Sequence, residues 1–289
     1  MRLAPEIEGA DRPLVALETS VLAQGLPPPR NEEAARRIDE AVRAAGALPA
    51  WTWVDDGEVR LGASAGDLDR LCAEPAAKVA RRDLPMAVAR RGLGATTASA
   101  ALWIAARADI EVAATGGIGG VHPGGGDVSA DLLELARTPV TLVCSGPKSI
   151  TDPGATLERL EELGVGVVGY GADRLPFFLA REAPIELEHR ADTPEEAAAI
   201  AGARRDLELE AALLVCVPVP RDHALDPDEV AGAVVRCQER AAGEAVRGKE
   251  LTPFLLRCLA EETGGRSLEA NLALLEENAR VAGAIAAAL

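Results

Sequence analysis

Aromatic residues make up only 2% of the 289 residues, so the core has to be built mainly from Ala, Leu and Val. Proteins that bind single-stranded nucleic acids stack the bases on aromatic side chains, which disfavours that class. Basic residues are outnumbered as well, 30 against 46 acidic ones, and the net charge is −16. The average field of such a chain repels nucleic acids and anionic membranes. A small anion could bind only at a local basic pocket.

Cysteine and histidine are too few and too scattered to indicate a zinc site. The three histidines lie far apart, at positions 122, 189 and 223, and the five cysteines include no Cys-x-x-Cys pair. The usual zinc-binding spacings are therefore missing. We expect the cysteines to be small buried apolar side chains, reduced as in the cytosol.

A long hydrophobic run is also missing. The longest uncharged apolar run covers residues 95–106, whereas a membrane-spanning helix needs about 20 residues. The first residues carry acidic side chains where a signal peptide has an apolar stretch. We predict a cytoplasmic protein with no membrane partner. Its 48% of hydrophobic residues is enough for a globular core.

What the sequence does contain is a regular alternation of short apolar runs with helical patterns. Runs typical of buried strands cover residues 14–17, 111–115, 140–144, 165–169 and 212–217. Helical patterns cover residues 31–46, 95–107, 130–136 and 267–289, and a further helix ends at Gly164. This alternation indicates an α/β fold, with a largely parallel central sheet and helices on both faces. No repeat or linker divides the chain, so we predict a single α/β domain over residues 1–289.

Local signals mark the ends of several elements. Asn31 and Ser129 are expected to cap helices. Asp56-Gly57 has the composition of a hairpin turn. Thr193 and Asp226 each precede a proline, which is typical of a helix start.

Polar side chains follow three of the predicted strands. In open parallel sheets, ligands bind beyond the carboxyl ends of the strands, and Glu18, Thr115 and Lys148 occupy such positions. Taken alone, a Glu or a Lys there is usually a solvated surface residue. Taken together, they suggest an imine-forming lysine beside a proton-carrying carboxylate. Both interpretations stay open at this point.

Phosphate could bind in two places, neither of which matches an established motif. The glycine loop at residues 116–120 lacks the Gly-x-Gly-x-x-Gly spacing of dinucleotide sites, and the turn at 145–149 lacks the Walker spacing. The basic segment Lys78, Arg81 and Arg82 is most often a solvated face. In a chain this acidic, it is also one of the few places that could hold a phosphate.

Seven segments of the sequence together resemble the pseudouridine-5′-phosphate glycosidase family. They occur in the family's order and spacing, over about residues 13–289. The segments are LVALETSVLAQGLPPPRN, KVARRDLP, GATTASA, ATGGIGGVH, DVSADLLELARTPVTLVCSGPKSI, GKELTPFLL and TGGRSLEANLALLEENA. The resemblance implies an α/β enzyme that forms or cleaves the carbon–carbon bond between C1 of ribose 5-phosphate and an aromatic ring.

The resemblance also assigns the catalytic and metal-binding residues. Lys148 aligns with the lysine that forms a Schiff base with the ring-opened sugar, and Glu18 aligns with the proton-transferring glutamate. Asp127 aligns with the aspartate that holds Mn²⁺ through a water-rich shell, a ligand set that suits a hard cation. A C-glycosidic bond has no leaving-group oxygen to protonate, so an iminium supplies the electron sink.

The remaining site residues are predicted to bind substrate. They are Lys78, Ala98, Ser129, Ala130, Asp131 and Asn271 by alignment, with Thr115, His122 and Gln24 from the matching segments. The expected partners are small molecules, ribose 5-phosphate and an aromatic ring, with no nucleic acid. By resemblance the protein is expected to be a homotrimer.

Three departures from the family pattern fall in segments that are expected to line the pocket for the aromatic ring. The family's Ser-His-Gly is Ala23-Gln24-Gly25 here, its Asn-Pro-Ile-Pro begins with Val217, and the loop before Asp127 is shorter. These changes suggest a larger and more apolar ring pocket, so the sequence favours C-ribosylation of an aromatic polyketide natural product. Cleavage of pseudouridine 5′-phosphate into uracil and ribose 5-phosphate is the alternative reaction. A non-catalytic sugar-phosphate-binding protein is the alternative of another class.

Overall fold

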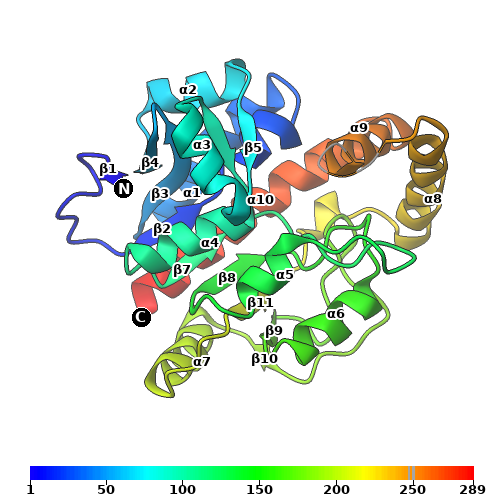
Figure 1. Cartoon of the computed structure of the whole chain (residues 1–289). Coiled ribbons are helices and arrows are strands. Elements are labelled where there is room, and N and C mark those ends of the chain that lie inside the picture. The colour runs from blue at the N-terminus through cyan, green and yellow to red at the C-terminus, as the bar shows by residue number, and fades with distance from the viewer. Residues whose placement is uncertain (247, 249–250) are drawn as a thin grey trace.

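The computed structural model describes residues 1–246, 248 and 251–289, and within them one mixed sheet organises the chain (Figure 1). The main path of the sheet has the order β1-β4-β3-β2-β7-β8-β11-β9-β10, and β5 and β6 pair beside β3. The strands are β1 (Arg2–Leu3), β2 (Leu14–Leu17), β3 (Leu48–Asp55), β4 (Glu58–Leu61), β5 (Ala77–Val79), β6 (Gly94–Thr96), β7 (Val112–Ala114), β8 (Thr141–Cys144), β9 (Gly166–Tyr170), β10 (Arg190–Ala191) and β11 (Leu213–Cys216).

Most strand pairs are parallel, as predicted. The pairs β3-β2, β2-β7, β7-β8, β8-β11 and β11-β9 form the parallel centre of the sheet. Strand β3 pairs in antiparallel fashion with both β4 and β6. The predicted hairpin is the β3–β4 connection, where Asp56 and Gly57 both have positive φ, as its turn requires.

Helices cover both faces of the sheet, which confirms the predicted α/β fold. Side chains alternate along each buried strand, so Val15, Val143 and Val215 pack into one core and Ala16, Leu142 and Leu214 into the other. The first core contains α1 (Arg30–Ala44), α7 (Pro194–Asp206), α8 (Pro227–Gly243), α9 (Leu251–Glu262) and α10 (Arg266–Ala288). The second contains residues of α3 (Leu84–Arg90), α4 (Ala98–Arg107), α5 (Ala130–Leu135) and α6 (Pro153–Glu162). Helix α2 (Ala65–Ala73) lies beside β3 and β6, where Leu71 packs against Trp53.

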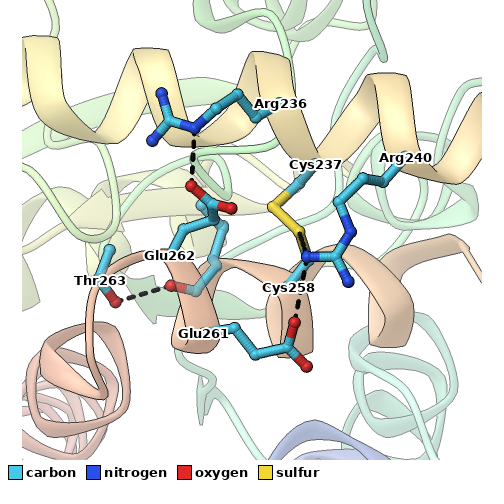
Figure 2. Close-up of a disulfide and its surroundings, with 8 residues drawn as sticks. Arg236, Cys237, Arg240, Cys258, Glu261, Glu262 and Thr263 are labelled. Carbon is cyan, nitrogen blue, oxygen red and sulfur yellow. Dashed lines mark hydrogen bonds and ion pairs between the residues drawn. A yellow bond between two sulfur atoms is a disulfide. The ribbon is translucent and has the colours of Figure 1, made fainter.

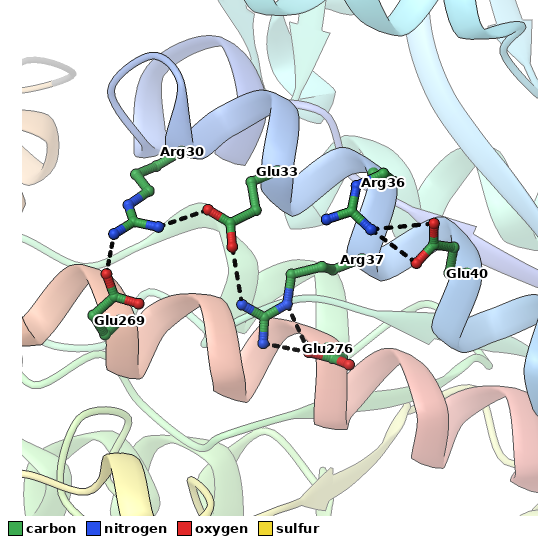
Figure 3. A network of polar contacts seen from close by, with 7 residues as sticks. All are labelled: Arg30, Glu33, Arg36, Arg37, Glu40, Glu269 and Glu276. Carbon is green, nitrogen blue, oxygen red and sulfur yellow. Dashed lines mark hydrogen bonds and ion pairs between the residues drawn. The ribbon is translucent and has the colours of Figure 1, made fainter.

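The C-terminal helix α10 lies beneath the middle of the sheet and packs along α1. Ion pairs connect the two helices at their exposed edge (Figure 3), where Arg30 and Arg37 share Glu33 and reach Glu269 and Glu276 respectively. Exposed pairs of this kind contribute about 0–1 kcal/mol each, so the apolar contacts hold the two helices together. The predicted long C-terminal helix is confirmed.

Two helix starts differ from the prediction. Asn31 is not an N-cap, because α1 begins at Arg30 and the buried Asn31 side chain donates to the carbonyls of Leu22 and Cys72. Helix α4 begins only at Ala98, because residues 94–96 pair with β3 and β5 as strand β6. The sequence pattern alone does not show these partners.

The other predicted caps are present. Ser129 accepts from the backbone of Asp131 at the start of α5, Thr193 from that of Glu196, and Asp226 from those of Asp228 and Glu229. In a capping box the Glu196 carboxylate would accept from the Thr193 backbone, but here it accepts from the Asp192 backbone. In the helix predicted to end at Gly164, which is α6, Leu160 is buried and Leu157 is only partly buried.

The prediction of five reduced cysteines is wrong. A disulfide joins Cys237 of α8 to Cys258 of α9 (Figure 2). The two positions are 21 residues apart, and only the pairing of α8 with α9 brings them together. Cys144 and Cys216 are buried free thiols in the sheet, as expected, and Cys72 is partly exposed. No helix in the described part of the chain is long and apolar enough to cross a membrane.

Candidate active site

Three neighbouring strands end at the same edge of the sheet, and each one presents a predicted catalytic or binding residue there. Strand β2 leads into Glu18, β7 into Thr115, and β8 into the turn that carries Lys148. Because β7 lies between β2 and β8, the parallel register places these residues side by side. They line one cleft.

The Glu18 carboxylate is held by three donors. Ser20 Oγ donates to Oε2 over 2.6 Å and the Val21 backbone donates to the same atom over 3.2 Å, while Thr115 Oγ1 donates to Oε1 over 3.2 Å. Ser20 and Val21 can reach back because the chain turns sharply into a π-helical turn, η1 (Val21–Gly25), directly after β2. A buried carboxylate with both oxygens engaged is fixed in one orientation.

A buried asparagine of α10 supports the strand ends from below. Asn278 is fully buried and donates to the carbonyls of Thr115 and Gly116, over 2.9 and 3.1 Å. Its Oδ1 accepts from Ser145 Oγ over 3.2 Å. One side chain therefore connects the ends of β7 and β8. Sequence reasoning missed Asn278, because its position within a helical pattern carries no sign of this role.

Lys148 stands on a turn that needs glycine. Gly146 has a φ of +73°, and a Cβ on it would overlap the carbonyl oxygen of Pro176. The Lys148 backbone donates to Ile118 and accepts from Thr151, so the chain is fixed on both sides of the residue. The Lys148 amine makes no hydrogen bond or ion pair with another described residue. It is partly buried and borders the cleft.

The cleft has two compartments that share Glu18, Lys148, Thr115, Ser20, Lys78 and Thr252. We call them the polar and the apolar compartment. The polar compartment encloses about 760 Å³ with its mouth, and its further lining includes Ala98, Ser99, His122, Ser129, Ala130 and Asp131. The apolar compartment encloses about 480 Å³ with its mouth, and its further lining includes Val21, Gln24, Phe178, Pro253, Leu256 and Asn271.

The polar compartment lies at the N-terminus of α4. Helix N-termini attract anions, because their N–H groups lack partners within the helix. Asp131 fixes this end, since its carboxylate accepts from the backbones of Ser99 and Gly119 over 3.1 and 3.0 Å. Lys78 and Arg82 add positive charge to the wall.

Only part of the basic segment faces the polar compartment. Arg81 instead donates to both oxygens of the buried Glu134, over 2.8 and 3.0 Å. Thr138 Oγ1 also donates to Glu134, over 2.6 Å. The segment is thus neither a uniform solvated face nor a three-residue phosphate site.

Phe178 forms a wall of the apolar compartment in an unusual backbone conformation. Its φ is +56°, which is rare for a bulky residue and is found where surrounding structure enforces it. The Phe178 backbone donates to Ser145 over 2.7 Å, and Ser149 Oγ contacts the flanking residues Phe177 and Leu179. Sequence reasoning missed Phe178, because its position depends on contacts distant in the chain.

The predicted metal ligand lies apart from the other site residues. Asp127 is exposed on a glycine-rich loop and lines neither compartment, although its backbone carbonyl accepts from the His122 backbone. Burial lowers the pKa of His122; the Asp127 charge opposes this shift and the Lys148 charge adds to it. The described residues contain no group of three His, Cys, Asp or Glu side chains that could share a metal. With Asp127 as its protein ligand, a cation there would take its other ligands from water, and none of the proposed steps passes through a metal.

The other predicted site residues all line the cleft. Two expectations about the pocket for the aromatic ring need correction, those for Val217 and for the shortened loop before Asp127. Val217 is buried in the first core and does not line the apolar compartment. The shortened loop before Asp127 follows His122, which borders the polar compartment. Neither departure therefore enlarges the apolar compartment. The matching segment 248–256 includes residues 249 and 250, which lie outside the described residues, but Thr252, Pro253 and Leu256 line the cleft.

Known proteins resemble this chain over nearly its whole length. A family model described as indigoidine synthase A like protein matches residues 6–288. A protein of Symbiobacterium thermophilum named pseudouridine-5′-phosphate glycosidase is 48% identical over 296 residues, with 99% of this chain and 96% of the relative covered. A protein of the same name from Gemmatimonas aurantiaca is 51% identical over 278 residues, with 96% and 91% covered.

Two solved structures share the fold over nearly their whole length. The indigoidine synthase A-like protein of Thermotoga maritima has a TM-score of 0.90 and 41% identity, with 95% of this chain and 92% of that chain covered. The prealnumycin C-glycosynthase, solved in complex with ribulose 5-phosphate, has a TM-score of 0.91 and 37% identity, with 100% and 96% covered.

Proposed function

The chain belongs to the family of indigoidine synthase A-like proteins, a family of enzymes, and from this premise we propose that it cleaves pseudouridine 5′-phosphate with water into uracil and ribose 5-phosphate. The observation that carries the proposal is the meeting of two unlike compartments at Lys148 and Glu18. A sugar phosphate fits the compartment with the helix N-terminus and basic side chains. A flat ring fits the compartment with apolar walls.

In the proposed reaction, Lys148 is the nucleophile. Its unprotonated amine adds to C1 of the sugar and displaces the ring oxygen, which takes up the proton that the amine loses, and the ribose opens. The C1–ring bond then breaks, its electron pair goes to the ring carbon, and C1 becomes an iminium on the lysine nitrogen. Water hydrolyses the iminium, which releases ribose 5-phosphate and restores the amine.

Glu18, in its protonated form, is proposed to supply the proton that the leaving ring carbon takes up, and the proton released when water hydrolyses the iminium restores its carboxyl group. Its three hydrogen bonds orient the carboxyl group at the boundary of the two compartments, where the bond to be broken has to lie. Ser20 and Thr115 act as positioning residues, because they contact the carboxylate and hold it in place.

C-ribosylation of an aromatic polyketide is the second candidate. The relatives named glycosidases are 48% and 51% identical to this chain, against 37% for the C-glycosynthase. The structure also removes two of the three sequence arguments for a larger ring, since Val217 lies in the core and the short loop borders the other compartment. These observations favour cleavage.

The test of the function is direct. Purified enzyme should release uracil from pseudouridine 5′-phosphate, measured by chromatography, and Lys148→Ala should release none. Ribose 5-phosphate with borohydride should leave a reduced sugar adduct on Lys148, detected by mass spectrometry. Trapping without uracil release would contradict the cleavage reaction and favour C-ribosylation. An equal adduct in Lys148→Ala would contradict the role of the lysine.

Three further expectations join the proposal. Mn²⁺ bound at Asp127 is expected to support turnover. A chelator should therefore stop uracil release, and added Mn²⁺ should restore it in the parent enzyme but not in Asp127→Ala.

Assembly as a homotrimer is to be tested by sedimentation, where a monomer would contradict it. A cytoplasmic location is to be tested by cell fractionation.

A further inference from the structure

Two strands that lead into the cleft meet end to end along one edge of β3. Strand β2 pairs with residues 48–51 of β3, and β6 pairs with residues 53 and 54, while β4 occupies the opposite edge. Thr52 lies between the two pairings. The junction matters for the cleft, because β2 leads into Glu18 and β6 leads into the start of α4.

Three threonine hydroxyls fill this junction. Thr19, Thr52 and Thr96 are fully buried, and none of the three lines either compartment. The hydroxyls of Thr19 and Thr96 both donate to the carbonyl of Thr52, over 2.8 and 2.6 Å. The Thr52 hydroxyl donates to the carbonyl of Leu17 over 2.9 Å. The hydroxyls therefore supply donors where β2 and β6 end.

Thr19 and Thr96 also bond to each other in both directions. The Thr96 backbone donates to Thr19 Oγ1 over 3.0 Å, and the Thr19 backbone donates to the carbonyl of Thr96 over 3.2 Å. Thr19 directly follows Glu18 in the chain, and Thr96 lies two residues before Ala98, where α4 begins. The pair thus joins the turn that carries Glu18 to the helix N-terminus that borders the polar compartment.

Packing alone does not explain these hydroxyls. Valine has almost the same shape as threonine and suits strands equally well. With valine, however, the carbonyls of Leu17 and Thr52 would lose their side-chain donors. A buried polar network whose members are all satisfied fixes one arrangement of the groups that it connects. Here the connected groups are the Glu18 turn and the start of α4.

We propose that Thr19, Thr52 and Thr96 are positioning residues that hold Glu18 in register with a sugar phosphate bound at the N-terminus of α4. This inference rests on the proposed function and extends it to the placement of the proton donor. The phosphate anchors one end of the substrate, and Glu18 has to reach the ring carbon at the other end. A misplacement of about 1 Å between such groups can cost roughly 100-fold in rate.

The test measures uracil release from pseudouridine 5′-phosphate by Thr96→Val, which keeps the shape of the side chain and removes its hydroxyl. We expect kcat to fall roughly 5- to 150-fold, the effect of one lost buried hydrogen bond. KM and the affinity for ribose 5-phosphate, measured by calorimetry, should stay within about twofold, because the groups that bind the sugar phosphate are kept. Thr96→Ser keeps the hydroxyl and should retain kcat within about threefold of the parent.

Two comparisons distinguish the positioning role from general damage to the fold. Thr19→Val removes the other hydroxyl of the same link, so the losses of kcat in Thr19→Val and Thr96→Val should not multiply in the double variant. Thr141→Val is the control, since its buried hydroxyl has no hydrogen-bond partner among the described residues, and it should leave kcat unchanged. If thermal melting shows that Thr96→Val does not fold, Thr19→Val carries the same test.

Three outcomes would overturn the inference. They are a kcat of Thr96→Val equal to that of Thr141→Val, a loss of ribose 5-phosphate affinity as large as the loss of kcat, and single losses that multiply in the double variant. If the parent enzyme releases no uracil from pseudouridine 5′-phosphate, the proposed function is wrong and this inference falls with it. If uracil is released and the Thr96 variants behave like the control, this inference alone is wrong.

Discussion

Thr115 donates its hydroxyl proton to Glu18 Oε1 over 3.2 Å, which ties the ends of the neighbouring strands β7 and β2 at the centre of the cleft. Both residues are buried. The hydrogen bond is a consequence of topology, because parallel strands that end in register bring the first residues beyond them together. It also means that Glu18 depends on a residue almost a hundred positions away.

Replacing Thr115 by Val should therefore impair the proton transfer proposed for Glu18 and leave the nucleophile intact. The variant keeps the shape of the side chain and removes one donor to the carboxylate. We expect kcat for uracil release to fall about tenfold, the effect of a ~1.4 kcal/mol loss. The borohydride-trapped adduct on Lys148 should form as before.

The matched control is Thr141→Val, the same substitution at a buried hydroxyl that has no hydrogen-bond partner among the described residues. It should leave kcat unchanged. A kcat for Thr115→Val equal to that of the control would contradict the positioning role of Thr115.

Much of this edge could be predicted from the sequence because it follows from local rules. Apolar runs indicate strands, and polar residues directly after them indicate the binding edge, so the sequence alone places Glu18, Thr115 and Lys148 at the edge where the cleft lies. Asn278 and Phe178 could not be found in this way. The first looks like any polar residue of a helix, and the position of the second depends on a left-handed backbone held by distant contacts.

The misjudged features share the same cause. Asn31 fits an N-cap by sequence, but its amide is used to bridge two carbonyls in the core. Cys237 and Cys258 do not form a recognisable motif, and only the packing of α8 on α9 makes them partners. In each case a tertiary contact decides between local alternatives.

A methyl group at Gly117 should disturb the wall of the apolar compartment. A Cβ there would lie 2.8 Å from Phe178 Cδ2 and 3.0 Å from the carbonyl oxygen of Gly146. Phe178 has little freedom to retreat, because its backbone is already held at positive φ. We expect Gly117→Ala to lose about 1–3 kcal/mol of unfolding free energy and to bind uracil more weakly.

Denaturant unfolding and calorimetry measure the two effects. Gly92→Ala is the matched control, since a Cβ at Gly92 meets no atom within 4 Å, and it should change neither quantity. Parent-like stability and uracil affinity in Gly117→Ala would show that the compartment can adapt.

The Cys72 thiol should react slowly at neutral pH although it is partly exposed. Burial raises its pKa to about 11, and the charges of Glu32 and Asp69 act in the same direction. Only the thiolate is nucleophilic, so the rate of alkylation by iodoacetamide should keep rising up to about pH 11. Asp69→Asn should shift this profile to lower pH. A rate that already levels off near pH 9 in the parent protein would contradict the raised pKa.

The disulfide should stabilise the helix pair that borders the cleft. It joins α8 to α9, and α9 supplies Thr252, Pro253 and Leu256 to the cleft. Closing a loop of this length contributes about 2–4 kcal/mol to stability, so Cys237→Ser/Cys258→Ser should unfold at lower denaturant concentration and show a higher KM. Reductant should have the same effect on the parent protein and none on the double variant. Cys72→Ser serves as the control, because it removes a thiol that is not in the bridge. If the double variant unfolds and turns over like the parent, the bridge supports neither the helix pair nor the cleft.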